Sequence, residues 1–296
     1  MELLKRYQNG NVLVSLYKDG TRHLEYEGTL ELEYPLNIDI TVSSRCSNGI
    51  DPRTGKAICS YCHVSARRDG VEGDYKVLKK RLLPLPRGIE LAIAVNEFTK
   101  RLMEFLEWAN EIGFVVNLTV NQIHLPKYKG YINWLINQDI VKGLGISYRK
   151  GYESNNVLFL LEYENTVLHC IAGLDNINTI LESPYNKVLI LGYKNLGLGK
   201  EFYDLDPLSI ERNIREWQMW LPKLFGKKIV SFDNLAIEQL NVKRFFSKRS
   251  WEVFYQMEES IYIDTVEGIY SPSSRDVDKK VSWNDLEIKD YFRSLK

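Results

Sequence analysis

Short apolar runs recur along the chain and predict buried strands. Six of them cover residues 37–42, 89–95, 114–120, 143–147, 166–172 and 187–193. These runs are rich in Val and Ile and apolar on both faces, and helical stretches separate several of them, which is typical of a parallel sheet covered by helices. The pattern predicts an α/β fold in which six parallel strands form a partial (β/α)6 TIM-like barrel.

Two helices are well marked between and after these runs. The first has its apolar residues at a spacing of three and four, namely Leu102, Phe105, Leu106, Ala109 and Ile112. Thr99 is placed to cap the start of this helix and Gly113 to end it. A second helix is predicted over residues 209–225, whereas residues 153–165 fit a helix and a strand equally well.

Residues 1–34 predict an N-terminal β-hairpin that is appended to the barrel. Apolar and polar residues alternate from residue 11 onward and again over 30–33, and Asp19-Gly20 supplies a turn between the two stretches. Alternation of this kind on both sides of an Asp-Gly turn is the signature of a hairpin.

Residues 35–228 then carry the predicted barrel, and residues 229–296 form a C-terminal cap or extension. Within the extension, residues 229–233 predict a further strand, and apolar and polar residues alternate over 259–270. We expect this region to cover the mouth of the barrel and to direct polar side chains toward a substrate, from among Asp233, Asn234, Tyr262 and Asp264.

Composition and charge exclude some classes of partner. Lys plus Arg and Asp plus Glu both number 39, so no overall field draws the chain to nucleic acid or to an acidic membrane. No apolar run approaches the roughly 18 residues that span a bilayer, and the N-terminus has no signal-peptide pattern. We therefore expect a cytoplasmic protein without a membrane partner or a clear nucleic-acid footprint. In the cytoplasm its cysteines stay reduced.

Chemistry in parallel α/β sheets gathers at the C-terminal ends of the strands, where the loops converge. In this chain those ends carry small, polar or metal-binding residues: Cys46, Asn96, Glu97, Asn121, Gln122, Ser147, Gly173, Tyr193 and Lys194. The glycine-rich stretch 194–200 lacks the spacing of a phosphate-binding loop. We interpret it as a flexible loop after the sixth strand, with its first residues facing the mouth.

Three cysteines lie within 17 residues after the first strand: Cys46, Cys59 and Cys62. Three thiolates are one short of a closed four-coordinate site, so the spacing favours a metal site with an open position. A structural zinc ion is the alternative, with His63 or a remote residue as the fourth ligand. The fourth cysteine, Cys170, lies inside an apolar run and is expected to be a small buried core residue.

Taken with the strand context, these cysteines resemble those of the radical S-adenosylmethionine enzymes. That family carries Cys-x3-Cys-x2-Cys in the loop after the first barrel strand, often with an aromatic residue before the last cysteine. Cys59 and Cys62 match the last two ligands and Tyr61 matches the aromatic residue, whereas Cys46 is separated from Cys59 by twelve residues, as in members with expanded loops.

Two further family signatures match in part. The family's Gly-Gly-Glu-Pro run after the second strand corresponds to residues 95–99, which keep Glu97 and lose both glycines and the proline. The family's fifth-strand motif keeps Ile171 and Gly173. More distantly, the chain is similar to uncharacterised radical enzymes of phage genomes. The altered second signature leaves open a protein that binds the cluster without turnover.

The resemblance implies an enzyme that holds a [4Fe-4S] cluster on Cys46, Cys59 and Cys62. Such an enzyme takes an electron from an external donor, cleaves S-adenosylmethionine and abstracts hydrogen from an unidentified substrate, which is a small molecule, a nucleotide or a peptide. The implied cofactor-binding residues are Glu97, Asn96, Asn121, Ser147 and Gly173. The alternative is a non-catalytic zinc-binding or cluster-binding protein on a degenerate barrel of this type.

Overall fold

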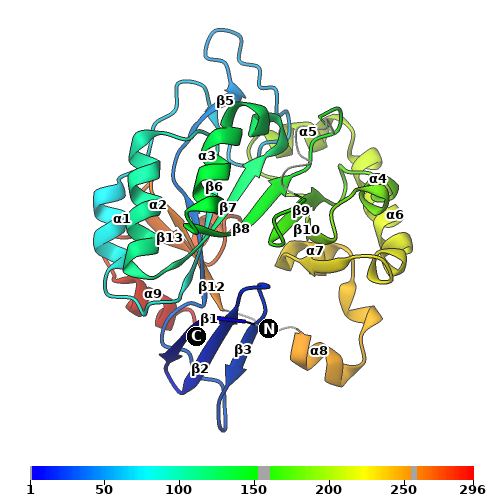
Figure 1. The fold of residues 1–296 in the computed structure, drawn as a ribbon. Helices are drawn as coiled ribbons and strands as arrows, with labels where there is room; N and C mark the ends of the chain where they lie inside the picture. The colour runs from blue at the N-terminus through cyan, green and yellow to red at the C-terminus, as the bar shows by residue number, and fades with distance from the viewer. Residues whose placement is uncertain (1, 153–160, 255–258) are drawn as a thin grey trace.

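The computed structural model describes residues 2–152, 161–254 and 259–296. Within them, the main sheet has ten strands (Figure 1). Their spatial order is β11 (Ile229–Phe232), β10 (Lys187–Leu191), β9 (Thr166–Ile171), β8 (Val141–Ser147), β7 (Val115–Asn121), β6 (Glu90–Val95), β4 (Asn37–Thr41), β12 (Ser260–Asp264), β13 (Ile269–Ser271) and β14 (Val281–Ser282).

The six predicted strands are all present as β4 and β6 to β10. Each pairs in parallel with the next one along this series, and β11 and β12 add a parallel strand at either side. The β13 and β14 strands pair antiparallel. The protein is therefore a mixed α/β fold with a large, mostly parallel sheet. The strands that the structure describes form an open sheet and no closed barrel.

Helices flank the sheet on both sides of the view in Figure 1. They are α1 (Tyr75–Leu82), α2 (Lys100–Ile112), α3 (Leu125–Asn137), α4 (Ile177–Glu182), α5 (Leu198–Leu205), α6 (Pro207–Phe225), α7 (Asn234–Gln239), α8 (Lys248–Phe254) and α9 (Ile288–Ser294). Both helices predicted from the sequence, α2 and α6, are confirmed. The Thr99 hydroxyl accepts a hydrogen bond from the Leu102 amide at 3.2 Å, and Gly113 ends α2 with a φ of 104°. Much of the ambiguous segment 153–165 lies outside the described residues.

The two faces of the parallel sheet differ in polarity. On one face, alternate residues such as Ile38, Ile93 and Leu118 are buried in the core. On the other face, many of the intervening residues are polar and at least partly accessible, and we call this the polar face: Asn37, Asp39, Thr41, Asn117, Thr119, Asn121, Ser147 and His169. The expectation of strands that are apolar on both faces is therefore wrong for β4 and β7. Successive side chains of a strand point to opposite faces, so the runs that form β4 and β7 contain polar positions among their apolar ones.

The N-terminal region forms a separate antiparallel sheet of β1 (Leu3–Asn9), β2 (Val12–Tyr17) and β3 (Arg22–Glu25). The predicted turn at Asp19-Gly20 lies between β2 and β3. The structure adds the strand β1, and residues 30–33 are not a strand. Instead, the Asn9 side chain accepts hydrogen bonds from the amides of Glu33 and Tyr34, both at 2.9 Å. These bonds satisfy the backbone without a sheet partner.

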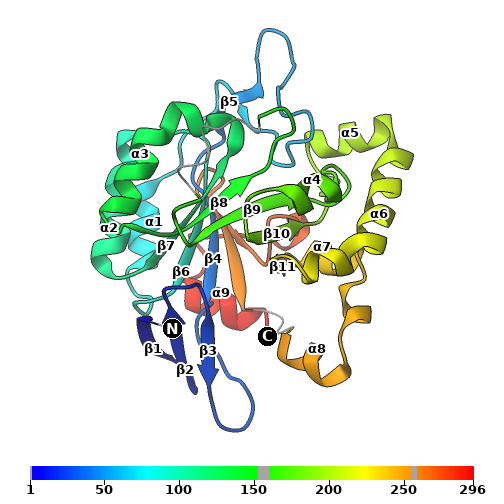
Figure 2. The ribbon, with the colours of Figure 1, turned by 45° about the vertical axis from the view of Figure 1, so that its right-hand side comes forward.

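This small sheet lies at the end of the main sheet opposite to β5 (Arg45–Ile50), as both ribbon views show (Figures 1 and 2). Its Arg22 forms ion pairs with Glu90, at the start of β6, and with Glu259, directly before β12. Lys187, at the start of β10, donates to the Asp19 carbonyl at 3.1 Å. The small sheet therefore covers the N-terminal ends of the parallel strands as a floor.

Four strands that the structure describes in the C-terminal region, residues 229–296, belong to the main sheet. The β11 strand pairs with β10, and β12 pairs with β4, so the sheet continues past residue 228. The Tyr262 hydroxyl of β12 donates to the Thr41 hydroxyl at 2.9 Å. Asp233 caps α7 and accepts hydrogen bonds from the amides of Ala236 and Gly192. Among the residues that the structure describes, no helix is both long and apolar enough to cross a membrane.

Candidate metal centre

The loop between β4 and α1 carries the three clustered cysteines, and we call residues 42–74 the cysteine loop. Its first part is β5, which contains Cys46, and its later part folds back against β5 through the backbone. The Asn48 carbonyl accepts hydrogen bonds from the amides of Ile58 at 3.0 Å and Cys59 at 3.4 Å, and the Cys62 amide donates to the Cys59 carbonyl at 3.2 Å. These bonds bring the distant Cys46 and the Cys59–Cys62 turn to one end of the sheet.

The three thiols are electrostatic neighbours. Burial raises the pKa of the Cys46 thiol, and the charges that Cys59 and Cys62 would carry raise this pKa further. Burial also raises the pKa of the Cys59 thiol, whereas the nearby Arg149 guanidinium lowers it. All four cysteines are free thiols. Because each thiolate would repel the others, a bound cation is what would favour the deprotonated state of all three together.

The cysteines fit a soft metal or an iron–sulfur cluster by the chemistry of their donor atoms, since thiolates are the ligands that such centres prefer. Within the described ranges, no three His, Cys, Asp or Glu side chains lie close enough to hold one metal ion together. The thiols are therefore neighbours in a loop and not a preformed ligand shell. Ligand binding would draw them together.

A histidine that sequence analysis did not select lies against the cysteines. His124 ends the short 3₁₀ helix η1 (Gln122–His124) after β7 and is buried. Its Nε2 atom is 3.7 Å from the Sγ atom of Cys46 and 3.2 Å from the Nδ2 atom of Asn48. Burial, with a smaller contribution from Lys127, lowers the pKa of His124 to about 4, so its imidazole is neutral at pH 7. By contrast, His63 lies near the charge of Lys194.

Arg149, directly after β8 and Tyr148, braces the cysteine loop from the neighbouring strand end. Its guanidinium donates to the Ile58 carbonyl at 2.9 Å and lies 4.6 Å from the centre of the Tyr61 ring. Its amide donates to the Gln122 side chain at 2.9 Å. A single arginine thus contacts the residues before Cys59 and between Cys59 and Cys62.

The glycine-rich stretch packs on the cysteine loop and is not a free loop. The Leu198 amide, at the start of α5, donates to the Cys62 carbonyl and to the Ser65 hydroxyl, both at 3.1 Å. A Cβ atom on Gly197 would lie 2.6 Å from the His63 carbonyl oxygen, and one on Gly199 would lie 2.5 Å from that of Lys194. These glycines therefore permit close backbone packing around the cysteines.

The predicted cofactor-binding residues lie at the same ends of the strands as the cysteines. Asn96 and Glu97 follow β6 and are partly buried, and the Glu97 carboxylate is within electrostatic reach of Lys127 on α3. Asn121 and Ser147 are partners in the register of β7 and β8. The Asn121 side chain also accepts a hydrogen bond from the Ile123 amide at 3.1 Å, which caps η1.

Gly173 follows β9 and has a φ of 99°, a conformation that favours glycine. A Cβ atom here would lie 3.1 Å from the Cγ2 atom of Ile210 and 3.3 Å from the Cγ1 atom of Ile214, both on α6. Backbone conformation and helix packing together account for this glycine.

The polar face adds two titratable groups that the sequence pattern did not identify, Asp39 and His169. Asp39 of β4 accepts a hydrogen bond from the Asn37 side chain at 3.0 Å. Its side chain is reachable by solvent, although it lies deep enough that burial raises the pKa of its carboxyl group. Lys194, whose charge reaches Asp39, donates to the Ser274 hydroxyl at 2.8 Å. Burial lowers the pKa of the polar-face residue His169 to about 4.

The only signal for Asp39 and His169 in the sequence is a polar residue inside an apolar run.

Comparisons with known proteins assign no role to any residue of the site. No family model matches the chain, and a search of the curated proteins finds no significant match.

Proposed function

We propose that this protein is a radical S-adenosylmethionine-type enzyme that holds a [4Fe-4S] cluster on Cys46, Cys59 and Cys62. The observation that carries the proposal is the placement of three thiols in one loop, after β4, at the C-terminal end of a parallel sheet. The unbroken sequential order of β4 and β6 to β10 supports the finer description of the sheet as a partial (β/α)6 barrel.

A cluster held by three cysteines leaves one iron open to S-adenosylmethionine and supplies the electron for its reductive cleavage and for hydrogen abstraction from a substrate. The chain's own residues hold and shield this centre. Arg149 and α5 fix the cysteine loop, and the neutral His124 lies within 3.7 Å of the Cys46 sulfur. The floor formed by β1 to β3 closes the far end of the strands and limits access of water.

For S-adenosylmethionine we propose a site along the ends of β6 to β9. Glu97 receives the amino group of the methionine part, with Asn96 beside it. Asn121 and Ser147 contact the ribose or the carboxylate, and Gly173 lets the adenine approach the backbone. The substrate, a small molecule, a nucleotide or a peptide, then faces Asp39, His169 and Lys194. The need for reduced thiols and for an external electron donor fits a cytoplasmic location.

The proposal is tested with protein reconstituted with iron and sulfide without oxygen. S-adenosylmethionine is expected to change the electron paramagnetic resonance spectrum of the reduced cluster and to be converted slowly to 5′-deoxyadenosine and methionine. Glu97→Ala should weaken binding about tenfold, because a charged hydrogen bond is lost. Glu104→Ala, on the exposed surface of α2, is the matched control and should leave binding unchanged.

A spectrum that stays unchanged at saturating S-adenosylmethionine would show that replacement of the two signature glycines has closed the site. A second outcome is a protein that holds a full cluster and binds S-adenosylmethionine and yet forms no more product than a Cys59→Ala control. That result would contradict the proposed activity and would indicate a cluster-binding protein without turnover.

A structural zinc site is the second candidate, and the position of His124 favours it specifically. Three thiols and one neutral imidazole make a Cys3His set, which is a common ligand set of structural zinc. His124 is therefore a candidate for the remote fourth ligand that this alternative needs.

The metal content of protein isolated without oxygen separates the two candidates. We expect brown protein with iron and sulfide in similar amounts, and we expect His124→Ala to keep its iron because the three thiols suffice. Colourless protein with zinc that His124→Ala loses would instead favour the zinc site. Asn48→Ala is a useful control variant, because it removes the side-chain amide that contacts His124 and leaves every candidate metal ligand in place.

A further inference from the structure

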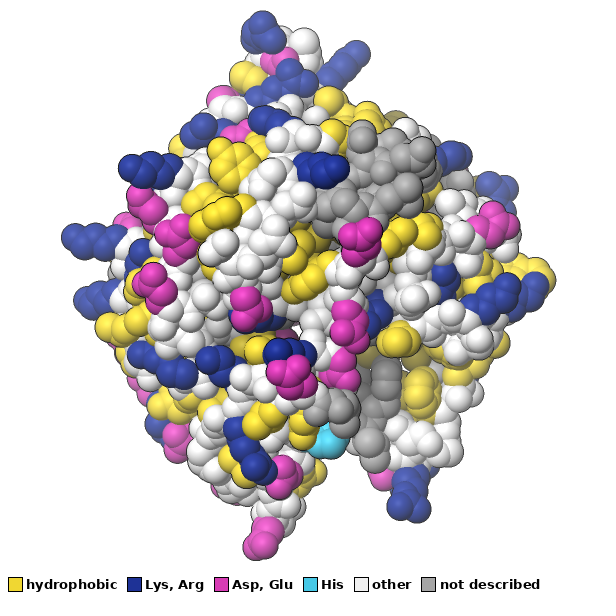
Figure 3. Space-filling view, in the orientation of Figure 1, with side chains coloured by type: hydrophobic (Ala, Val, Ile, Leu, Met, Phe, Trp, Pro, Cys, Tyr) yellow, Lys and Arg dark blue, Asp and Glu magenta, His cyan; other side chains and the backbone are white. Residues whose placement is uncertain are grey.

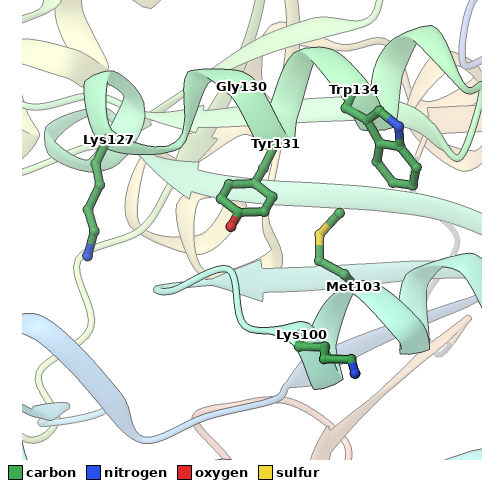
Figure 4. Close-up of a pocket in the computed structure, with 6 residues that line it drawn as sticks. All are labelled: Lys100, Met103, Lys127, Gly130, Tyr131 and Trp134. Carbon is green, nitrogen blue, oxygen red and sulfur yellow. The ribbon is translucent and has the colours of Figure 1, made fainter.

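An apolar groove lies between α2 and α3 on the outer surface of the molecule. It encloses about 650 Å³ and is lined by Lys100, Met103, Lys127, Gly130, Tyr131 and Trp134. Figure 4 shows Tyr131, Trp134 and Met103 facing the groove from the two helices, with the two lysines at its margins. Tyr131 is 47% exposed and Trp134 is 40% exposed, so two large aromatic side chains of α3 remain uncovered.

A continuous series of side-chain contacts leads from this groove to the cysteines. The ring centres of Tyr131 and Tyr128 are 6.3 Å apart, and those of Tyr128 and His124 are 6.2 Å apart. His124 then lies 3.7 Å from the sulfur of Cys46. Phe98 packs between the two tyrosines, with its ring centre 5.7 Å from Tyr131 and 5.1 Å from Tyr128. Electron tunnelling weakens steeply with distance, so a packed route of this kind favours electron transfer between surface and thiol.

The margins of the groove carry positive charge. The Lys100 side chain is 90% exposed and its ammonium group lies 3.7 Å from Glu104, which offsets the charge only in part because the pair is solvated. Lys127 lies over the Tyr128 ring at 4.8 Å, and Lys79 of α1 donates to the Glu104 carbonyl at 3.4 Å. Figure 3 shows Lys and Arg side chains projecting along this edge of the molecule, among scattered acidic ones.

We propose that the groove between α2 and α3 docks a small acidic electron-carrier protein, which reduces the metal centre through Tyr131, Tyr128 and His124. This inference rests on the proposed function, since it requires a redox-active cluster at Cys46. The carrier is oxidised by one electron and the cluster is reduced by the same electron, with no bond broken and no proton transferred. Aromatic side chains in the groove and lysines at its edge match an apolar contact surrounded by acidic groups.

The test measures the rate at which a reduced acidic flavodoxin bleaches the cluster absorbance in stopped flow. Replacing both lysines, in Lys100→Glu with Lys127→Glu, should slow this reduction about tenfold at low salt, because charge complementarity acts on association. Reduction by dithionite, a small reductant, should not change. Lys223→Glu with Lys227→Glu makes the same change of charge at two exposed lysines at the end of α6 and should have no effect.

The Tyr131→Leu variant distinguishes docking of the carrier from electron transfer through the aromatic side chains. It keeps the groove apolar, so the affinity for oxidised flavodoxin, measured by calorimetry, should stay within about twofold, while the reduction rate falls. Equal rates in wild type, the lysine variant and Tyr131→Leu would overturn the proposal and place electron entry elsewhere, for instance at the cysteine loop. Failure of the wild type to hold any cluster would overturn the proposed function together with this inference, and iron analysis detects that outcome independently.

Discussion

Cys59→Ala is expected to leave the reconstituted protein without its iron and sulfide. Of the four cysteines, only Cys46, Cys59 and Cys62 are gathered in the cysteine loop, so the loss of one leaves two thiolates, which do not hold a cluster of four irons. Iron and sulfide analysis after anaerobic reconstitution measures the effect, and the content should fall to the background level. Cys46→Ala and Cys62→Ala should behave alike.

Cys170→Ser provides the control for this prediction. Cys170 is fully buried in β9, and its sulfur lies 3.8 Å from the Leu189 carbonyl, which a serine hydroxyl is able to reach as a donor. Cluster content should therefore stay at the wild-type level. Full iron content in Cys46→Ala would contradict the assignment of three ligands. Cys46 is the most informative cysteine to replace, because its spacing from Cys59 departs from the family pattern.

Arg22→Met is expected to lower the free energy of unfolding by about 3–5 kcal/mol, the usual cost of removing one partner from a buried ion pair. Arg22 is largely buried and pairs with both Glu90 and Glu259, so its loss leaves two carboxylates in the floor without their counter-charge. Urea unfolding measures the change. Arg6→Met is the matched control, because its pair with Glu25 is exposed and is worth less than about 1 kcal/mol.

The pH dependence of this variant gives a second check. Burial already raises the pKa of Glu259 in the folded state, and the charge of Arg22 lowers it. Removing Arg22 raises the folded-state pKa further, so the folded variant binds protons more readily than the unfolded chain does. Its stability should then fall as the pH rises through this raised pKa. We expect the gap to wild type to widen as the pH rises above the ordinary pKa of a glutamate, and a gap independent of pH would contradict this explanation.

The sequence predicts the parts of the fold that depend on local pattern. The six parallel strands follow from their apolar runs, and α2 follows from its spacing together with Thr99 and Gly113. The strand β1 was not predicted, because its residues are mostly polar and it is stabilised by pairing with β2. The segment 30–33 alternates like a strand, but hydrogen bonds from Asn9 hold the neighbouring backbone instead.

Local sequence pattern reveals even less of the candidate site, because contacts between distant residues build it. The cysteine spacing identifies the loop, whereas the contact of His124 with Cys46 joins residues 78 positions apart and leaves no local pattern. The glycines 197 and 199 resemble a phosphate loop in isolation, and their packing against His63 and Lys194 appears only once the chain is folded. Contacts of this kind depend on topology, which local periodicity does not determine.

The pairing of β12 with β4 has a consequence for the synthesis of the protein. The hydrogen bond between Tyr262 and Thr41 joins residues 221 positions apart, so the strand that leads into the cysteine loop acquires its second neighbour only after β12 has left the ribosome. Until then, β4 is an exposed edge that is open to pairing with other chains. Metal loading before β12 pairs with β4 would therefore act on an unfinished sheet, and insertion after this pairing is the safer order of assembly.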